Sequence, residues 1–486
     1  MKLKHQFKDS NIERDVNDSM PLGFFLSNKI GGMLFFDAKK DLTQYYARIN
    51  NSTLKVIHDI NFESPVTALN HKFHSLAVSR QDHTNELFVP HYMNALLLKL
   101  NERVPVELVF DLTDIKQQNG VDHNIYEKQG RVVIRSSSGG SLIYTAIQGD
   151  RLFYESKKQG KMLCLNIMSP RIALAVSDNE NAAISEANHL FENEHKIKGV
   201  QEKYISASAS FSDPEKSLAY ACALNGMDCM LLFAKEENNA IIPVPVFSDV
   251  KGHHLCLAMH ALLLEGEFGI AKKTLVGELE SPHARLQNGY SSFEEAAWPV
   301  MMFGKLLNHL CSHEKLYSYF SAEEIQAIAE KIAKLTVILD SQSQTKLESK
   351  ALLLSIYNLV HALTKMGDYF DAEQELRAKT RNLLLKEILP GLNEKILSIE
   401  DVSSIFLTAY IYPVLLSKDE WKSCFDAILE KMHNNFNTLQ RKMLDNETPS
   451  LDLEVFGLAS LAATVLCRTD SDHYKQQLDA LVKSTI

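Results

Sequence analysis

The stretch GRVVIRSSSGGSLIYTAIQGDRLFYESKKQGKMLCLNI, residues 130–167, decides the fold class of the first part of the chain. Its glycines recur about every ten residues, and the runs between them are rich in β-branched and aromatic side chains. Turn residues at this spacing, separated by short strand-forming runs, are typical of an antiparallel sandwich or barrel. Similar runs at 24–26, 34–36 and 106–110 extend the pattern, so we predict an antiparallel β-sandwich domain over residues 1–180.

The pattern changes near residue 180, where helical periodicity replaces strand periodicity. We expect residues 181–211 to form a linker helix followed by a serine-rich connector. The sequence SDPE at 212–215 then carries a helix-start signal, because the serine can cap the helix and the glutamate three residues later completes a capping box. The same signal recurs at Ser321–Glu324 and at Ser417–Glu420.

Roughly twelve amphipathic segments follow residue 212. In the segment after Ser321, for example, one helical face carries Ile325, Ile328, Ala329, Ile332 and Leu335. Twelve unequal helices after a β domain is the count of an (α/α)6 toroid, in which six helical hairpins close into a ring. Counting alone does not require closure. We predict this all-α toroid over residues 212–486.

Composition and charge exclude several classes of protein. The 486 residues include 61 acidic and 51 basic side chains, a net charge of -10, so neither nucleic acid nor an anionic membrane is an expected partner. No apolar run approaches the roughly 18 residues of a membrane helix, and the N-terminal residues lack a signal-peptide core. Seven scattered cysteines are typical of free thiols in a reducing compartment. We therefore expect a cytoplasmic protein; leaderless export and the oligomeric state stay open.

A series of short motifs also runs in order along nearly the whole chain. Its members are LSNKIGG at 26–32, TQYY at 43–46, PVFSDVKGHH at 245–254, LLLEGEFGIA at 262–271, YSSFE at 290–294 and YIYPVLLS at 410–417. The series resembles the amylo-α-1,6-glucosidase (glycogen-debranching) family, whose members pair a β-sandwich with an (α/α)6 barrel. This resemblance implies the same architecture, with closure of the ring, and an activity on α-linked glucose.

The resemblance also implies a set of site residues. Asp340 corresponds to the general acid and Glu454 to the general base of a glycoside hydrolase that inverts by direct displacement, with its two carboxyl groups roughly 6.5–9.5 Å apart. The residues expected to bind the sugar are Asp249, Glu294, Glu348, Trp298 and His254. We also expect the loops at 236–252 and 279–298 to bring Asp249 and Glu294 to a single sugar. The implied substrate is an oligo- or polysaccharide with α-linked glucose, and no cofactor or metal is implied.

Several departures from the family pattern leave a second hypothesis open. A Gly-Arg-Asp motif is replaced by Gly252-His253-His254, and tryptophans are lost from the motifs around Asp340 and Glu454. These losses favour a catalytically degenerate carbohydrate-binding or protein-interaction scaffold, whereas the retained acids favour the enzyme.

Individual site residues have alternative interpretations as well. Asp340 is also placed to end a helix, Glu454 to occupy the first turn of one, and Trp298 to fill a helix–helix contact. Besides Trp298, the tyrosines at 46, 290 and 317 are candidates for stacking against a sugar, because a tyrosine combines an apolar face with a polar tip.

Overall fold

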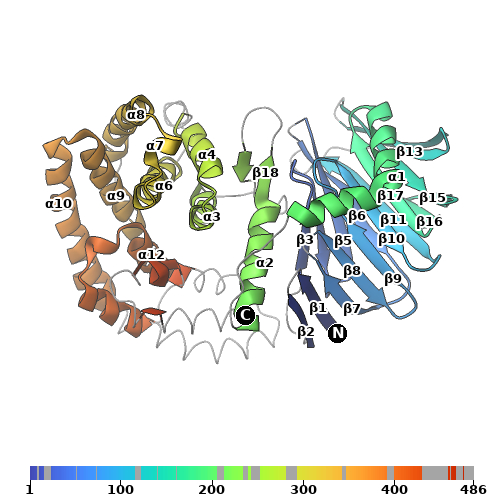
Figure 1. The fold of residues 1–486 in the computed structure, drawn as a ribbon, viewed down its shortest axis with the longest axis horizontal. Helices are drawn as coiled ribbons and strands as arrows, with labels where there is room; N and C mark the ends of the chain where they lie inside the picture. The colour runs from blue at the N-terminus through green and yellow to red at the C-terminus, as the bar shows by residue number, and fades with distance from the viewer. Residues whose placement is uncertain are drawn as a thin grey trace. The chain divides into compact units, whose positions relative to one another are not determined.

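A computed structural model describes most of the chain (Figure 1). It divides into two compact units, Met1–Asp249 and Val250–Ile486, which are described separately. The described residues are 1–7, 10–15, 23–50, 52–72, 74–114, 122–138, 141–159, 161–204, 213–233, 239–241, 252–280, 293–341, 346–390, 399–428, 458–459, 461–466 and 474–475.

Two β-sheets form most of the first unit, which confirms the predicted β region. The ten-stranded sheet contains, in spatial order, β12 (Asp122–Lys128), β13 (Arg131–Ser138), β14 (Ser141–Gly149), β17 (Arg171–Ser177), β10 (Ala95–Leu100), β9 (Thr84–Phe88), β8 (Ser75–Arg80), β7 (Val66–His71), β1 (Lys2–Phe7) and β2 (Ser10–Asp15). The seven-stranded sheet contains β15 (Phe153–Gln159), β16 (Met162–Met168), β11 (Pro105–Asp114), β6 (Ser52–Asn61), β5 (Leu42–Ile49), β4 (Met33–Asp37) and β3 (Gly23–Ser27). Strand pairs are antiparallel except β1–β7, which is parallel.

The two sheets share one hydrophobic core. Alternate residues of the strands point inward, so that Leu34 and Phe36 of β4 join Val78 of β8 and Leu98 of β10 in a single buried cluster. Alternation of this kind is what the strand-forming runs of the sequence predicted. The cluster draws residues from both sheets, which therefore pack face to face.

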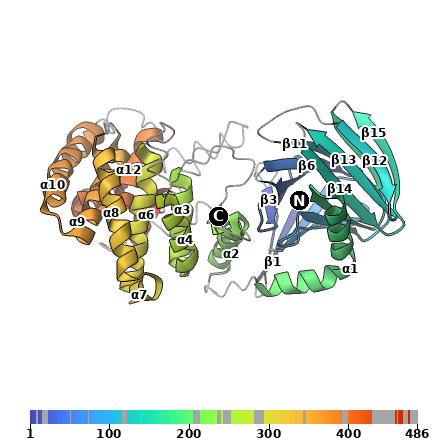
Figure 2. The same cartoon turned by 90° about the horizontal axis from the view of Figure 1, so that it is seen from above.

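The helix expected as a linker instead packs on the ten-stranded sheet. Helix α1 (Glu180–Tyr204) lies against β14, β17 and β10 (Figure 2). Its buried residues Ala183, Ile184, Ala187 and Leu190 form an apolar stripe that joins a second core cluster with Phe88 and Leu97. Burial of this stripe is the physical reason why the segment belongs to the β unit.

The first unit also contains residues that we expected in the helical domain. Helix α2 (Pro214–Met230) contacts β2 and β3, and the Cys229 thiol donates to the Phe25 carbonyl at 3.5 Å. A short antiparallel hairpin, β18 (Leu231–Phe233) and β19 (Asn239–Ile241), follows it. The compact units therefore divide near residue 249, whereas the change of period lies near residue 212.

The second unit is helical, as predicted. Its elements are α3 (Gly252–Glu265), α4 (Phe268–Glu280), α6 (Phe293–Ser312), α7 (Leu316–Tyr319), α8 (Ala322–Asp340), α9 (Leu347–Thr364), α10 (Gly367–Asn382) with its π-helical continuation η1 (Leu383–Ile388), α12 (Ile399–Ile411), the 3-10 turn η2 (Pro413–Leu415), and helical residues 418–428, 458–459 and 461–466. Among the described helices, none combines the length and the apolar character that crossing a bilayer requires.

The helices of this unit pack in a series. Helices α3, α6, α9 and α12 contact one another in that order, while α4 packs on α6, and both α8 and α10 pack on α9 (Figure 1). Closure of such a series into a ring depends on residues 429–486, most of which lie outside the described residues.

Local signals in the sequence correctly place the start of α8. The Ser321 hydroxyl accepts from the Glu324 amide at 3.1 Å, and the Glu324 carboxylate accepts from the Ser321 amide at 2.8 Å. This reciprocal pair is the predicted capping box. Of the predicted apolar face, Ile328, Ala329, Ile332 and Leu335 are buried.

Candidate functional site

Two of the predicted acids lie in the first turns of neighbouring helices. Glu294 is the second residue of α6 and Glu348 the second residue of α9, where the positive end of each helix dipole favours a carboxylate. The Ser349 hydroxyl of α9 donates to Glu294 Oε1 at 2.8 Å, and the Ser404 hydroxyl of α12 donates to Glu348. Hydrogen bonds therefore join these two acids to helices α9 and α12.

We call these four residues, Glu294, Glu348, Ser349 and Ser404, the acid–serine cluster. Ser349 is buried, and both carboxylates are half-buried. An ionised carboxylate offers about four acceptor positions, so one serine bond leaves it able to accept further hydroxyl groups. The cluster is therefore suited to a neutral polyol, whose hydroxyl groups can donate to half-buried oxygens.

Asp340 has a different setting. It is the last residue of α8, its side chain is exposed, and its carboxylate accepts a hydrogen bond from the Tyr357 hydroxyl of α9. Burial and the adjacent Asp340 raise the pKa of Tyr357, so the phenol remains a donor at neutral pH. Asp340 thus lies at a helix end, as its alternative interpretation predicted, and Tyr357 donates a hydrogen bond to its carboxylate.

Helix α9 also shows how Asp340 is placed relative to the acid–serine cluster. The carboxylate of Asp340 accepts its hydrogen bond from Tyr357 of α9. The acid–serine cluster instead uses residues 348 and 349 of the same helix. Nine residues of α-helix rise about 13 Å. The carboxylate of Asp340 is therefore anchored more than two helical turns along α9 from that of Glu348.

The remaining predicted site residues divide into two groups. Trp298 lies on α6 and is only 2% exposed, within the helical core. This burial agrees with its alternative interpretation as a helix–helix packing residue. Asp249 and Glu454 lie outside the described residues, as do most of the loops at 236–252 and 279–298. His254 falls in the first turn of α3, and its side chain lies outside the described part of the chain.

The tyrosines proposed for sugar stacking differ in their exposure to solvent. Tyr46 is buried in β5 and its hydroxyl donates to Gln44 at 2.9 Å, whereas Tyr317 on α7 is 78% exposed. Tyr290 lies outside the described residues. Exposure therefore leaves Tyr317, but not Tyr46, with a ring face accessible to a ligand.

The LSNKIGG motif forms a tightly bonded loop in the first unit. Asn28 Oδ1 accepts from the amides of Ile30 and Gly32 at 3.0 and 2.7 Å, and Asn28 Nδ2 donates to the Met93 carbonyl and to Asn94 Oδ1, both at 2.9 Å. A Cβ on Gly32 would lie 2.3 Å from Asn28 Nδ2, so glycine is required there. The motif thus joins the loop at 28–32 to the loop that follows β9.

The described residues include no group of three or more His, Cys, Asp or Glu side chains able to hold a metal ion. Comparison with models of known protein families finds no match, and neither does comparison with curated proteins.

Proposed function

We propose that this chain is a carbohydrate-active protein of glycosidase type that acts on α-linked glucose. The observation that carries the proposal is the acid–serine cluster, in which Glu294 and Glu348 meet hydroxyl donors from neighbouring helices. In this proposal the β unit is a sandwich, the helices close into an (α/α)6 toroid, and the cluster binds sugar hydroxyl groups.

The proposed reaction is inverting hydrolysis of an α-glucosidic bond. Asp340 is proposed as the general acid that protonates the leaving oxygen, and Glu454 as the base that activates water on the opposite face. Asp340 is exposed to solvent, and the Tyr357 hydroxyl orients its carboxylate, which supports a role in contact with substrate. The substrate would be an oligo- or polysaccharide with α-1,6 or related linkages.

A second candidate is a binding protein without hydrolytic activity. Two observations favour it. The Asp340 carboxylate already accepts a hydrogen bond from the Tyr357 hydroxyl, and Trp298 is buried in the helical core. A degenerate site of this kind would retain the acid–serine cluster for binding sugar and would lack turnover.

One experiment separates the two candidates. The purified full chain is incubated with isomaltose, panose, maltooligosaccharides, trehalose and glycogen, and released glucose is measured enzymatically. Sugar binding is measured in parallel by isothermal titration calorimetry. For the enzyme we expect glucose release, with the β-anomer formed first, because inversion at an α-linkage gives the β-product. Binding without release supports the second candidate, and the absence of both contradicts the proposal.

The Glu348→Gln variant tests the acid–serine cluster directly. Loss of the carboxylate charge weakens the bond from Ser404 and removes an acceptor for sugar hydroxyl groups. We expect sugar binding to weaken at least about fivefold, and the exposed acid Glu314, changed to Gln, is the matched control in the same unit.

A further inference from the structure

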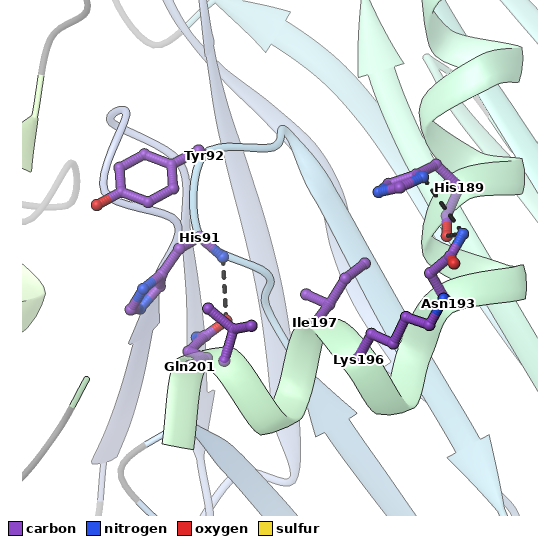
Figure 3. Close-up of a pocket in the computed structure, with 8 residues that line it drawn as sticks. His91, Tyr92, His189, Asn193, Lys196, Ile197 and Gln201 are labelled. Atoms are coloured by element: carbon purple, nitrogen blue, oxygen red, sulfur yellow. Dashed lines mark hydrogen bonds between the residues drawn. The ribbon is translucent and has the colours of Figure 1, made fainter. Parts of the chain in front are cut away.

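The first unit contains a pocket of about 290 Å³ outside the acid–serine cluster (Figure 3). One wall is the loop after β9, with His91 and Tyr92, and the other is the second half of α1. The pocket is close to the lower end of the roughly 300–1,000 Å³ typical of small-molecule sites, which suits a ligand of one or two rings.

The pocket is built into the fold. Gln201 of α1 accepts from the His91 amide at 3.1 Å and donates to the Val89 carbonyl at 3.1 Å, so the helix holds the loop in place (Figure 3). On the other side, the Tyr92 amide donates to the Asn28 carbonyl at 2.7 Å. The loop is thereby fixed at both ends, and the pocket is formed before a ligand arrives.

Tyr92 lines this pocket from the loop that follows β9. The backbone φ of Tyr92 is 64°, in the left-handed region that bulky residues seldom adopt. The residue is 52% exposed, so a ligand can reach its ring. A strained backbone that holds an aromatic ring toward solvent points to a binding role for that ring.

The helix wall supplies an apolar floor with polar groups beside it. Ile197 and Val200 line the pocket, and Val200 is 71% exposed. In the view of Figure 3, Ile197 lies between the Tyr92 ring and the His189 ring. Helix α1 is kinked at Asn193, whose Nδ2 donates to the His189 carbonyl at 3.1 Å, which leaves its Oδ1 to accept from a ligand.

The charge of the lining limits the chemistry of the ligand. Among the described residues that line it, there is no carboxylate and one lysine, Lys196. Burial, together with Lys29 and His74, lowers the pKa of His91 to about 3, so this imidazole is neutral at pH 7. These described residues supply no acidic ligand for a metal cation and little positive charge for a polyanion. A neutral ring with one apolar face and several hydroxyl groups fits the combination of aromatic ring, apolar floor and polar rim.

We propose that this pocket is a second carbohydrate-binding site, which binds one or two pyranose units by stacking on Tyr92. The choice of α-linked glucose as the sugar rests on the proposed function. The site lies wholly in the first unit, so it would hold a glucan chain without taking part in its cleavage.

Hydrogen–deuterium exchange of the full chain with maltoheptaose tests this site in a position-resolved way. We expect slower exchange of amides in 89–94 and 193–204 when the sugar is present. The Tyr92→Ala variant should remove this protection and weaken sugar binding to the site at least about fivefold, whereas Tyr92→Phe, which retains the ring, should keep it.

The control is Phe153→Ala, which removes an aromatic ring that is 66% exposed on β15 of the same unit. It should leave the protection of both segments unchanged. Thermal unfolding of each variant establishes that the first unit is intact. Unprotected segments in the wild type, or equal protection in Tyr92→Ala and wild type, would overturn the proposal.

The outcome is independent of hydrolysis. Protection of the two segments without glucose release supports the second binding site and contradicts the proposed hydrolytic activity. Glucose release without protection of these segments supports the proposed hydrolytic activity and contradicts the second binding site.

Discussion

The Ser349 hydroxyl lies 2.8 Å from Glu294 Oε1, so a hydrogen bond joins the first turn of α9 to the first turn of α6. Ser349 is 2% exposed, and the acid that it binds is half-buried. The same turn of α9 carries Glu348, which accepts from Ser404 of α12. The start of α9 therefore connects three helices through polar contacts.

Replacing Ser349 by Ala should destabilise the helical unit. The half-buried Glu294 carboxylate would lose its donor, and we expect the free energy of unfolding to fall by about 1–3 kcal/mol. Denaturant titration followed by circular dichroism measures the change. Ser312→Ala is the control, because Ser312 is exposed and donates to a carbonyl of its own helix; it should change stability by less than about 0.5 kcal/mol. Equal losses in the two variants would contradict a special role for the Ser349 bond.

Asp340→Asn tests the proposed general acid. We expect glucose release to fall at least about a hundredfold with the fold intact, because an amide cannot donate the proton that the leaving oxygen needs. Glu454→Gln should have an effect of similar size. Asp368→Asn, at an exposed acid in the first turn of α10, should retain wild-type turnover. Full activity of Asp340→Asn would exclude Asp340 as the acid.

Glu194→Gln should loosen α1 from the ten-stranded sheet. The Glu194 side chain is 1% exposed and lies 3.1 Å from both Lys99 and Lys198 and 3.7 Å from Arg171. Burial opposes ionisation, but the bonds from Lys198 and Lys99 prevail and lower the pKa of Glu194. Its loss would leave these cations without their shared partner, and we expect at least about 2 kcal/mol of destabilisation in thermal unfolding.

The matched control for that variant is Glu192→Gln, two residues earlier on α1 and exposed. It should change the free energy of unfolding by less than about 0.5 kcal/mol. A loss at Glu192 as large as that at Glu194 would indicate a general effect of acidic charge on the helix.

His71 should make the first unit sensitive to acid. Burial and the neighbouring His5 and His74 lower the pKa of His71 from 6.5 to about 3, and its Nδ1 lies 3.2 Å from His5 Nδ1. The unfolded chain therefore binds a proton at His71 below pH 6.5 that the folded chain does not bind until about pH 3. Stability falls as pH falls through this window, by about 2 kcal/mol at pH 5 from this group alone.

The measurement compares the free energy of unfolding at pH 7.5 and pH 5. We expect the decrease to be about 2 kcal/mol smaller in His71→Phe than in the wild type, because phenylalanine does not titrate. His195→Gln, at an exposed histidine of α1, should show the wild-type decrease. An unchanged decrease in His71→Phe would show that the acid sensitivity arises elsewhere.

Local patterns in the sequence predicted the strands of the first 180 residues and the helices of the second unit, but not the short hairpin of β18 and β19. The glycine spacing around residues 130–167 predicted antiparallel strands, and the capping box at Ser321 predicted the start of α8. Both signals act within a few residues, through turn conformations and backbone amides at a helix end, so they can be read without knowing the rest of the fold.

The tertiary structure alone decided which side chains meet. Tyr357 reaches Asp340 from 17 residues away, Ser349 reaches Glu294 from 55, and Gln201 holds the His91 loop from 110. Such contacts depend on how helices and sheets pack, and the sequence carries no periodicity that specifies them. Packing also placed α1 on the ten-stranded sheet, because its apolar stripe is buried only where the sheet offers a matching face.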